Sequence, residues 1–129
     1  QNGGLLLIDY GFLKQKNKNT LQSVKNHKLN VLFKNIGDAD ITSLLNFTLI
    51  KKYLIKKKLK VDNIVTQGFF LKKMGIMNRA EAVARRMNFK EKSDLYFRIQ
   101  RLINPKQMGE LFKFLFASKL KKKFSLGFN

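Results

Sequence analysis

The sequence predicts an α/β fold in which three strands belong to a doubly wound sheet that needs further strands to be complete. The first observation is an apolar run over residues 5–9, which ends on the acid Asp9. The second is the order of the elements, which reads strand, long loop, helix, strand, two helices and strand. The third is that three strands with so much apolar surface need neighbours. We therefore expect this chain to be one part of a larger domain.

Size and composition limit the class of protein. The chain has 129 residues, of which 44% are hydrophobic and 12% aromatic, so it is too apolar for a disordered segment and long enough for a core. No uncharged run approaches the roughly 20 residues that span a bilayer, and we expect no transmembrane segment. The absence of cysteine removes disulfides, thiolate nucleophiles and zinc clusters, and it fits a reducing compartment.

The formal net charge of +19 is the strongest compositional signal. Such a charge is common in proteins that bind nucleic acid, and a basic module that grips RNA or DNA through its lysines is the alternative function. We favour a solvated lysine surface, because lysines outnumber arginines 22 to 5 and readers of nucleic acid favour arginine. No specific nucleic-acid partner is therefore expected. The run of lysines at 121–123 is interpreted in the same way.

The first strand and the segment after it predict where a ligand binds. Residues 5–9 are too short for a helix and do not alternate, so they fit a strand that is covered on both faces inside a parallel sheet. Residues 12–37 are rich in lysine and asparagine and predict a long loop that closes at Gly37. Ligands of α/β sheets bind beyond the carboxyl ends of strands. We therefore expect the site at Asp9, Tyr10 and Gly11, beneath this loop.

A helix is predicted over residues 46–59. Phe47, Ile50 and Leu54 fall on one row of its surface, while lysines such as Lys51 lie on the other side. Asn46 is the expected N-cap. This lysine-rich helix also leaves open a third function, an assembly role in which the helix contacts a partner or a membrane surface.

The second half of the chain predicts a strand within residues 61–66, a turn at Gln67-Gly68, two helices and a last strand over residues 111–117. Pro105 is expected to end the second helix. Each helix has one apolar face, formed by Ala80, Val83, Ala84 and Met87 in the first and by Leu95, Ile99 and Leu102 in the second. In the last strand, Phe112, Phe114 and Phe116 are expected in the core.

Several short motifs occur in one order along the whole chain. They are Gly3-Gly4, Ile8-Asp9-Tyr10-Gly11, Thr20-Leu21-Gln22, His27, Gly37-Asp38-Ala39-Asp40-Ile41-Thr42, Gln67-Gly68, Gly75-Ile76, Arg79-Ala80, Arg101-Leu102, Met108-Gly109 and Gly127-Phe128. Together they resemble the C-terminal part of the MidA-like methyltransferases. These enzymes depend on S-adenosylmethionine, and their mitochondrial members assist assembly of respiratory complex I by methylating a protein arginine.

The resemblance implies the C-terminal portion of a class I, Rossmann-like methyltransferase fold: the last three strands of its sheet, the seventh antiparallel, with a long loop and inserted helices. Residues 1–129 would be a C-terminal fragment of a single methyltransferase domain. S-adenosylmethionine would be bound mainly by the absent N-terminal half, so cofactor-binding residues in this chain are unknown. The isolated chain is expected to be inactive. A protein substrate such as a complex I subunit is implied, in the bacterial cytoplasm or, in a eukaryote, the mitochondrial matrix.

Methylation of arginine predicts which side chains matter. A guanidinium stays protonated at neutral pH, so a carboxylate must hold it and help to remove a proton. Among the eight acids of the chain, we choose Asp9 and Asp40, together with Tyr10, as catalytic candidates. The candidates for binding substrate are Gln22, His27, Asp38 and Thr42.

Each candidate also has a purely structural interpretation. Asp9 can bond backbone amides next to its strand end, and Asp38 and Asp40 can start a turn. His27 is the only histidine of the chain, and a lone histidine in a loop is commonly a hydrogen-bonding residue. Since no second histidine exists to share a metal, we expect no metal site.

Overall fold

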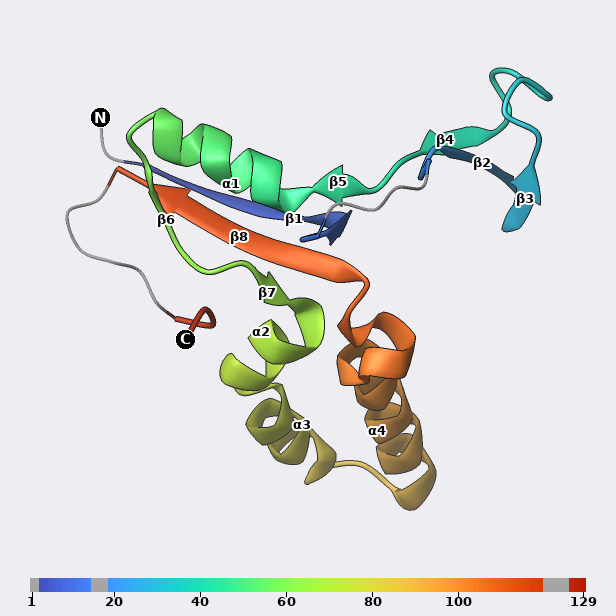
Figure 1. Ribbon diagram of the computed structural model, residues 1–129. Helices are drawn as coiled ribbons and strands as arrows, with labels where there is room; N and C mark the ends of the chain where they lie inside the picture. The colour runs from blue at the N-terminus through green and yellow to red at the C-terminus, as the bar shows by residue number, and fades with distance from the viewer. Residues whose placement is uncertain (1–2, 15–18, 120–125) are drawn as a thin grey trace.

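The computed structural model describes residues 3–14, 19–119 and 126–129, so the lysine run at 121–123 lies outside the described residues. The described chain forms a central sheet, a second small sheet that stands off from it, and a group of helices on the opposite side of the central sheet from helix α1 (Figure 1). The predicted α/β class is confirmed.

The central sheet has five strands among the described residues. They are β1 (Gly4–Phe12), β5 (Leu45–Asn46), β6 (Lys60–Val61), β7 (Val65–Thr66) and β8 (Phe112–Ser118). Their order is β5-β1-β8-β6, and β7 also pairs with β8. The long pair is antiparallel and runs from Gly4↔Ser118 to Tyr10↔Phe112. The predicted second strand is thus two short strands, β6 and β7, which pair with the same partner.

Strand β1 exists as predicted, but the expectation that both of its faces are covered is wrong for the described structure. Leu5, Leu6 and Ile8 remain 45–47% exposed. The reason is the position of β1 in the sheet. It bonds to β8 along one edge, whereas the other edge meets only β5, in parallel, at Gly11 and Phe12. Most of that second edge carries no partner within the described chain.

Helix α1 (Phe47–Lys56) covers one face of the sheet. Phe47 and Leu115 have no exposed surface, and they pack with Leu54 and Ala117 in one cluster. The predicted cap is confirmed, because the Asn46 side chain accepts a hydrogen bond from the amide of Leu49 at 3.0 Å. Burial of side chains of this size contributes about 2–3 kcal/mol each, so this cluster is the firmest part of the molecule.

The other face of the sheet is covered by aromatic side chains. Phe114 is buried and stacks on Phe70, with ring centroids 4.5 Å apart, and Phe128 packs beside them. Phe112 and Phe116 are partly buried in the same cluster, so the last predicted strand is covered on both sides as expected.

Helix α2 (Gln67–Lys73) corrects the prediction of a turn at Gln67-Gly68. Thr66 caps this helix through a hydrogen bond from the amide of Phe69. Gly68 is required for packing rather than for a turn, because a Cβ there would lie 2.5 Å from the carbonyl oxygen of Ile103. A glycine that allows a close approach cannot be told from a turn glycine in the sequence alone.

Helices α3 (Ile76–Ala84) and α4 (Phe89–Ile103) form the lobe below the sheet in Figure 1. Their buried residues are Ala80 and Ala84, and Ile99 and Ile103. Val83, predicted on the apolar face, is 42% exposed. Pro105 ends α4 as predicted and begins a short π-helical turn, η1 (Pro105–Gly109).

The loop predicted over residues 12–37 contains two strands, β2 (Gln22–Lys25) and β3 (Lys28–Asn30). They form an antiparallel sheet with β4 (Asp40–Thr42), which follows that loop, in the order β3-β2-β4. We call residues 19–44 the arm. Asn26 and His27 have φ values of 50° and 60° and form the two-residue turn between β2 and β3. The sequence signal was weak because the strands are very short and the turn is Asn-His instead of Asn-Gly.

Candidate functional site

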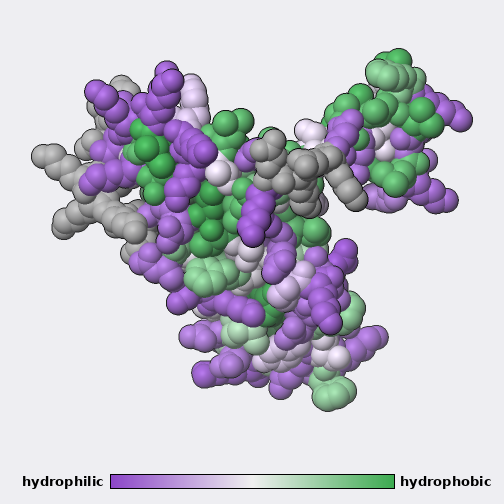
Figure 2. Space-filling view, viewed as in Figure 1, coloured by the Kyte–Doolittle hydropathy of each residue, from purple (hydrophilic) through white to green (hydrophobic). Residues whose placement is uncertain are grey.

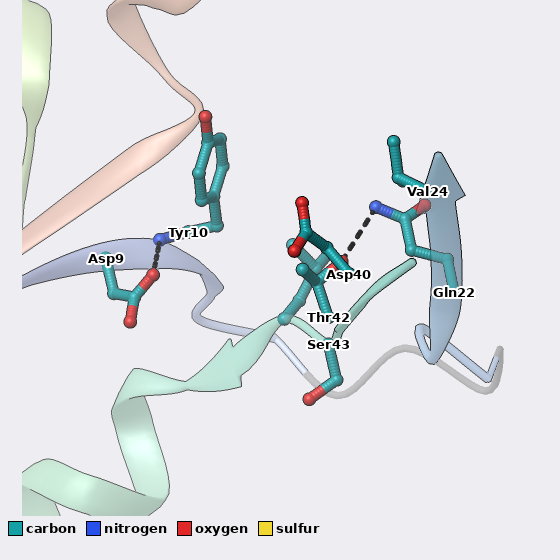
Figure 3. A pocket seen from close by; sticks show the side chains of 8 residues that line it. Asp9, Tyr10, Gln22, Val24, Asp40, Thr42 and Ser43 are labelled. Carbon is teal, nitrogen blue, oxygen red and sulfur yellow. Dashed lines mark hydrogen bonds between the residues drawn. The ribbon is translucent and has the colours of Figure 1, made fainter. Parts of the chain in front are cut away.

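A cavity of about 480 Å³ lies between the end of β1 and the base of the arm (Figure 3). Its lining residues are Asp9, Tyr10, Gln22, Val24, Asp40, Thr42, Ser43 and Leu44. Five of them are candidates from the sequence, namely all three catalytic candidates and two of the four substrate-binding ones. The fold therefore brings together residues that lie as far as 33 positions apart.

The cavity has its shape because the chain that returns from the arm is attached to the end of β1. Leu45 pairs with Gly11, and the amide of Leu44 donates a hydrogen bond to Thr20 Oγ1 at 3.2 Å. A Cβ on Gly11 would lie 2.6 Å from both the Leu45 carbonyl oxygen and a ring carbon of Phe47. Glycine at this position is what lets the two segments come so close.

The side chains of the cavity do not all face the same way. In Figure 3 the Tyr10 ring and the Asp40 carboxylate project to one side, and the Asp9 carboxylate points to the other. One Asp9 oxygen accepts a hydrogen bond from the amide of Tyr10 at 2.7 Å, which is the structural role considered for it. The Tyr10 ring packs against Phe112, with centroids 4.0 Å apart. Asp40 and Tyr10, and not Asp9, therefore project to the same side and can contact one ligand together.

Hydrogen bonding distinguishes the remaining candidates. Gln22 donates from Nε2 to Thr42 Oγ1 at 3.2 Å, and this bond links β2 to β4 in the cavity wall. Asp38 forms an ion pair with Lys25 at 3.2 Å and does not line the cavity. His27 sits in the hairpin turn of the arm, also outside the lining. Within the described residues, no hydrogen bond or ion pair engages the Asp40 carboxylate.

The charge of the cavity is opposite to that of the chain. Asp9 and Asp40 line it, and among the described residues no lysine or arginine does, although the chain as a whole carries a net charge of +19. A site with this lining favours a cationic ligand over an anionic one. Among the described residues, no three side chains of the types His, Cys, Asp and Glu gather closely enough to hold a metal ion.

Three residues of the lining were not predicted. Val24, Ser43 and Leu44 reach the cavity because they flank or belong to the strands of the arm. The sequence interpretation placed Val24 in the loop over residues 12–37 and predicted no strand before Ser43. Ser43 and Leu44 directly follow the candidate Thr42, and this adjacency was the sequence signal that could have identified them as lining residues. The described part of the chain also contains no helix with the length and hydropathy of a membrane span.

A family profile matches part of this sequence. The profile described as "Putative S-adenosyl-L-methionine-dependent methyltransferase" matches residues 1–65, which is half of the chain. The matched segment contains β1, the arm and α1, and therefore every residue that lines the candidate cavity.

Individual proteins match over a longer part of the chain. The mitochondrial protein arginine methyltransferase NDUFAF7 of Danio rerio is 31% identical over 112 residues, covering 87% of this chain and 26% of the relative. The Homo sapiens protein of the same name is 31% identical over 113 residues and is covered to 25%. This chain thus spans about a quarter of the length of these relatives. Both relatives and the family profile are methyltransferases, so the alternative of a nucleic-acid-binding module is not favoured.

Two crystal structures of Burkholderia thailandensis proteins have the same fold. One, from an uncharacterized protein, superposes with a TM-score of 0.82 at 24% identity, over 99% of this chain and 34% of the other. The second superposes with a TM-score of 0.78 at 24% identity, over 98% of this chain and 33% of the other. The second is described as a candidate methyl transferase bound to S-adenosyl-homocysteine.

Proposed function

Because its first half matches the profile, this chain belongs to the S-adenosyl-L-methionine-dependent methyltransferase family predicted from its motifs, and we propose that it forms the acceptor-binding side of an enzyme that methylates a protein arginine. The observation that carries this proposal is the cavity at the end of β1, in which the Asp40 carboxylate and the Tyr10 ring project to the same side and which no cation lines among the described residues. A guanidinium is the cationic side chain that this acceptor class presents.

The rest of the domain is proposed to complete the sheet at β1. Leu5, Leu6 and Ile8 are half-exposed, and the β1 edge opposite β8 has no described partner before Gly11. A further strand placed there would cover these side chains and satisfy the free backbone groups. The solved proteins with this fold are about three times as long as this chain, which is consistent with additional strands.

We assign no cofactor site to the described residues of this chain. No glycine-rich turn follows any of its described strands, although such a turn is the usual means of holding a nucleotide-like cofactor in this class of fold. We therefore assign S-adenosylmethionine binding to the remainder of the domain. Titration calorimetry of residues 1–129 with S-adenosylmethionine should detect no binding at micromolar concentrations. Firm binding would contradict the assignment of the cofactor site to the remainder of the domain.

The residues of this chain are proposed to bind the acceptor and to remove its proton. Asp40 would hold the guanidinium and accept a proton from it, since an attacking nitrogen must lose one. The Tyr10 ring, fixed against Phe112, would form the wall beside the acceptor side chain. Holding the acceptor in a fixed position accounts for most of the acceleration in a transfer of this type.

The test is methylation of arginine peptides by the full-length protein that contains this chain. Asp40→Asn should lower kcat at least 100-fold, as loss of a general base does, while the free energy of unfolding changes little because Asp40 is exposed on β4. Asp94→Asn, on the surface of α4, is the matched control and should be indistinguishable from the unmodified enzyme. Equal kcat values for the Asp40→Asn and Asp94→Asn variants would refute the role of Asp40.

A finer part of the proposal concerns the biological setting. The motif resemblance to MidA-like enzymes suggests a subunit of respiratory complex I as the acceptor, in the mitochondrial matrix for a eukaryotic source or in the cytoplasm for a bacterial one. Mass spectrometry of complex I from cells that lack this gene would test it. A methylarginine that disappears on deletion supports the assignment, and an unchanged methylation pattern contradicts it.

A further inference from the structure

A second hollow adjoins the candidate cavity and has the opposite charge. It measures about 530 Å³ and lies between the end of β1 and the turn η1 with the start of β8. Tyr10 and Leu44 line both hollows, so the two are neighbours along one surface. A ligand that fills the first and extends past Tyr10 therefore enters the second.

The second hollow combines apolar walls with lysines. Lys14 and Lys113 line it together with one acid, Glu110. The Lys113 ammonium donates a hydrogen bond to the backbone carbonyl of Glu110, which fixes it at the beginning of β8. Two cations against one carboxylate leave an excess of positive charge in the second hollow, whereas the first cavity is lined by Asp9 and Asp40 and by no cation among the described residues.

We propose that the second hollow binds an aspartate or glutamate that neighbours the methylated arginine in the acceptor, so that the acceptor segment is a dipolar pair of an arginine and an acidic residue. This inference rests on the proposed function and names the kind of segment that the enzyme selects. The two hollows present complementary charge to the two side chains of such a pair, and complementary charge gives specificity and association rate. The net charge of +19 would also favour an acidic surface around the arginine.

Peptide kinetics with the full-length protein test this directly. Three peptides each contain a central arginine and differ only in the residues on either side of it. These flanking residues are glutamate in the first peptide, glutamine in the second and lysine in the third. At 50 mM salt the glutamate peptide should have a KM about 3- to 10-fold below that of the glutamine peptide, with the lysine peptide weakest. At 300 mM salt the preference should shrink to about 2-fold, because exposed charges are screened.

Variants of Lys14 distinguish an effect of binding in the second hollow from an effect of the overall positive charge of the chain. Lys14→Glu should reverse the order of the KM values, so that the lysine peptide has a lower KM than the glutamate peptide. Lys52→Gln, on the exposed side of α1, removes a charge elsewhere and should leave the order of the three peptides unchanged. A reversal on Lys14→Glu cannot come from misfolding, because a smaller amount of folded enzyme lowers the rate with all three peptides by the same factor and leaves their order unchanged.

The outcomes distinguish the inference from the proposed function. Equal KM values for all three peptides, or an order that Lys14→Glu leaves unchanged, would overturn the inference alone, since methylation would still occur. Absence of methylation with every arginine peptide would overturn the proposed function and this inference with it.

Discussion

Two regions of the molecule differ in how they bury apolar side chains: the central sheet together with α1, and the arm. The sheet buries Phe47 and Leu115 completely and is closed on that face by a helix. In the arm no apolar side chain is buried, and five of them are 62–84% exposed: Leu29, Val31, Phe33, Ile36 and Ile41. Figure 2 shows hydrophobic surface gathered on the arm, away from the body of the molecule.

The two walls of the candidate cavity are therefore expected to differ in stability. One wall, at Asp9 and Tyr10, belongs to a long strand in a packed sheet. The other wall, at Asp40 and Thr42, belongs to a three-stranded sheet held by backbone ladders, the turn at His27 and polar bonds. Small sheets without a covered face are only marginally stable. The geometry of the cavity therefore depends on how firmly the base of the arm is attached to β1.

The largest effect is expected in the packed sheet. Phe47→Ala should lower the free energy of unfolding by about 3–5 kcal/mol, because it leaves a cavity beneath α1. Urea unfolding followed by circular dichroism measures it. Phe33→Ala removes an identical side chain from the exposed arm and should change the same quantity by less than about 0.5 kcal/mol. Similar losses in both variants would mean that the arm is packed and that the comparison is wrong.

The attachment of the arm to β1 should show an intermediate effect. In Gly11→Ala the added methyl group meets the Leu45 carbonyl and the Phe47 ring, and overpacking of this kind costs about 1–3 kcal/mol. Methylation by the full-length protein should fall as well, since the cavity wall at Leu44 must move. Gly3→Ala, where nothing lies within 4 Å of the new Cβ, is the control. A Gly11→Ala variant as stable and active as Gly3→Ala would show that the attachment does not depend on this glycine.

The smallest effect is expected at the hairpin turn. His27→Gly should stabilise the arm by about 0.5 kcal/mol, because glycine adopts a φ of 60° without the steric cost that other residues bear. His27→Ala keeps that cost and removes the imidazole, so it should not stabilise. Amide hydrogen exchange of the paired residues Val24 and Leu29 reports the change. A loss of methylation in both variants would instead assign the imidazole to substrate binding.

Much of the site could be predicted because its residues lie in short motif segments that can be recognised separately in the sequence. Asp9 and Tyr10 follow an apolar run, and Asp40 and Thr42 follow a glycine-containing turn. With Gln22, which came from the motif resemblance, these segments supplied five residues of the cavity lining. The resemblance also selected His27 and Asp38, which lie outside the lining, because the order of motifs along the chain gives no information on which side chains face inward.

The sequence by itself determined the α/β class, the cap and buried row of α1, the end of α4 at Pro105 and the family, since each depends on local periodicity, on a side chain that bonds its own neighbours, or on residue order. Three other features follow from the tertiary structure alone: Asp9 and Asp40 point in different directions, Gly68 serves packing, and most of one edge of β1 has no partner within the described part of the chain. Those features depend on which segment lies opposite which, and contacts between distant residues leave no periodic mark in a single chain.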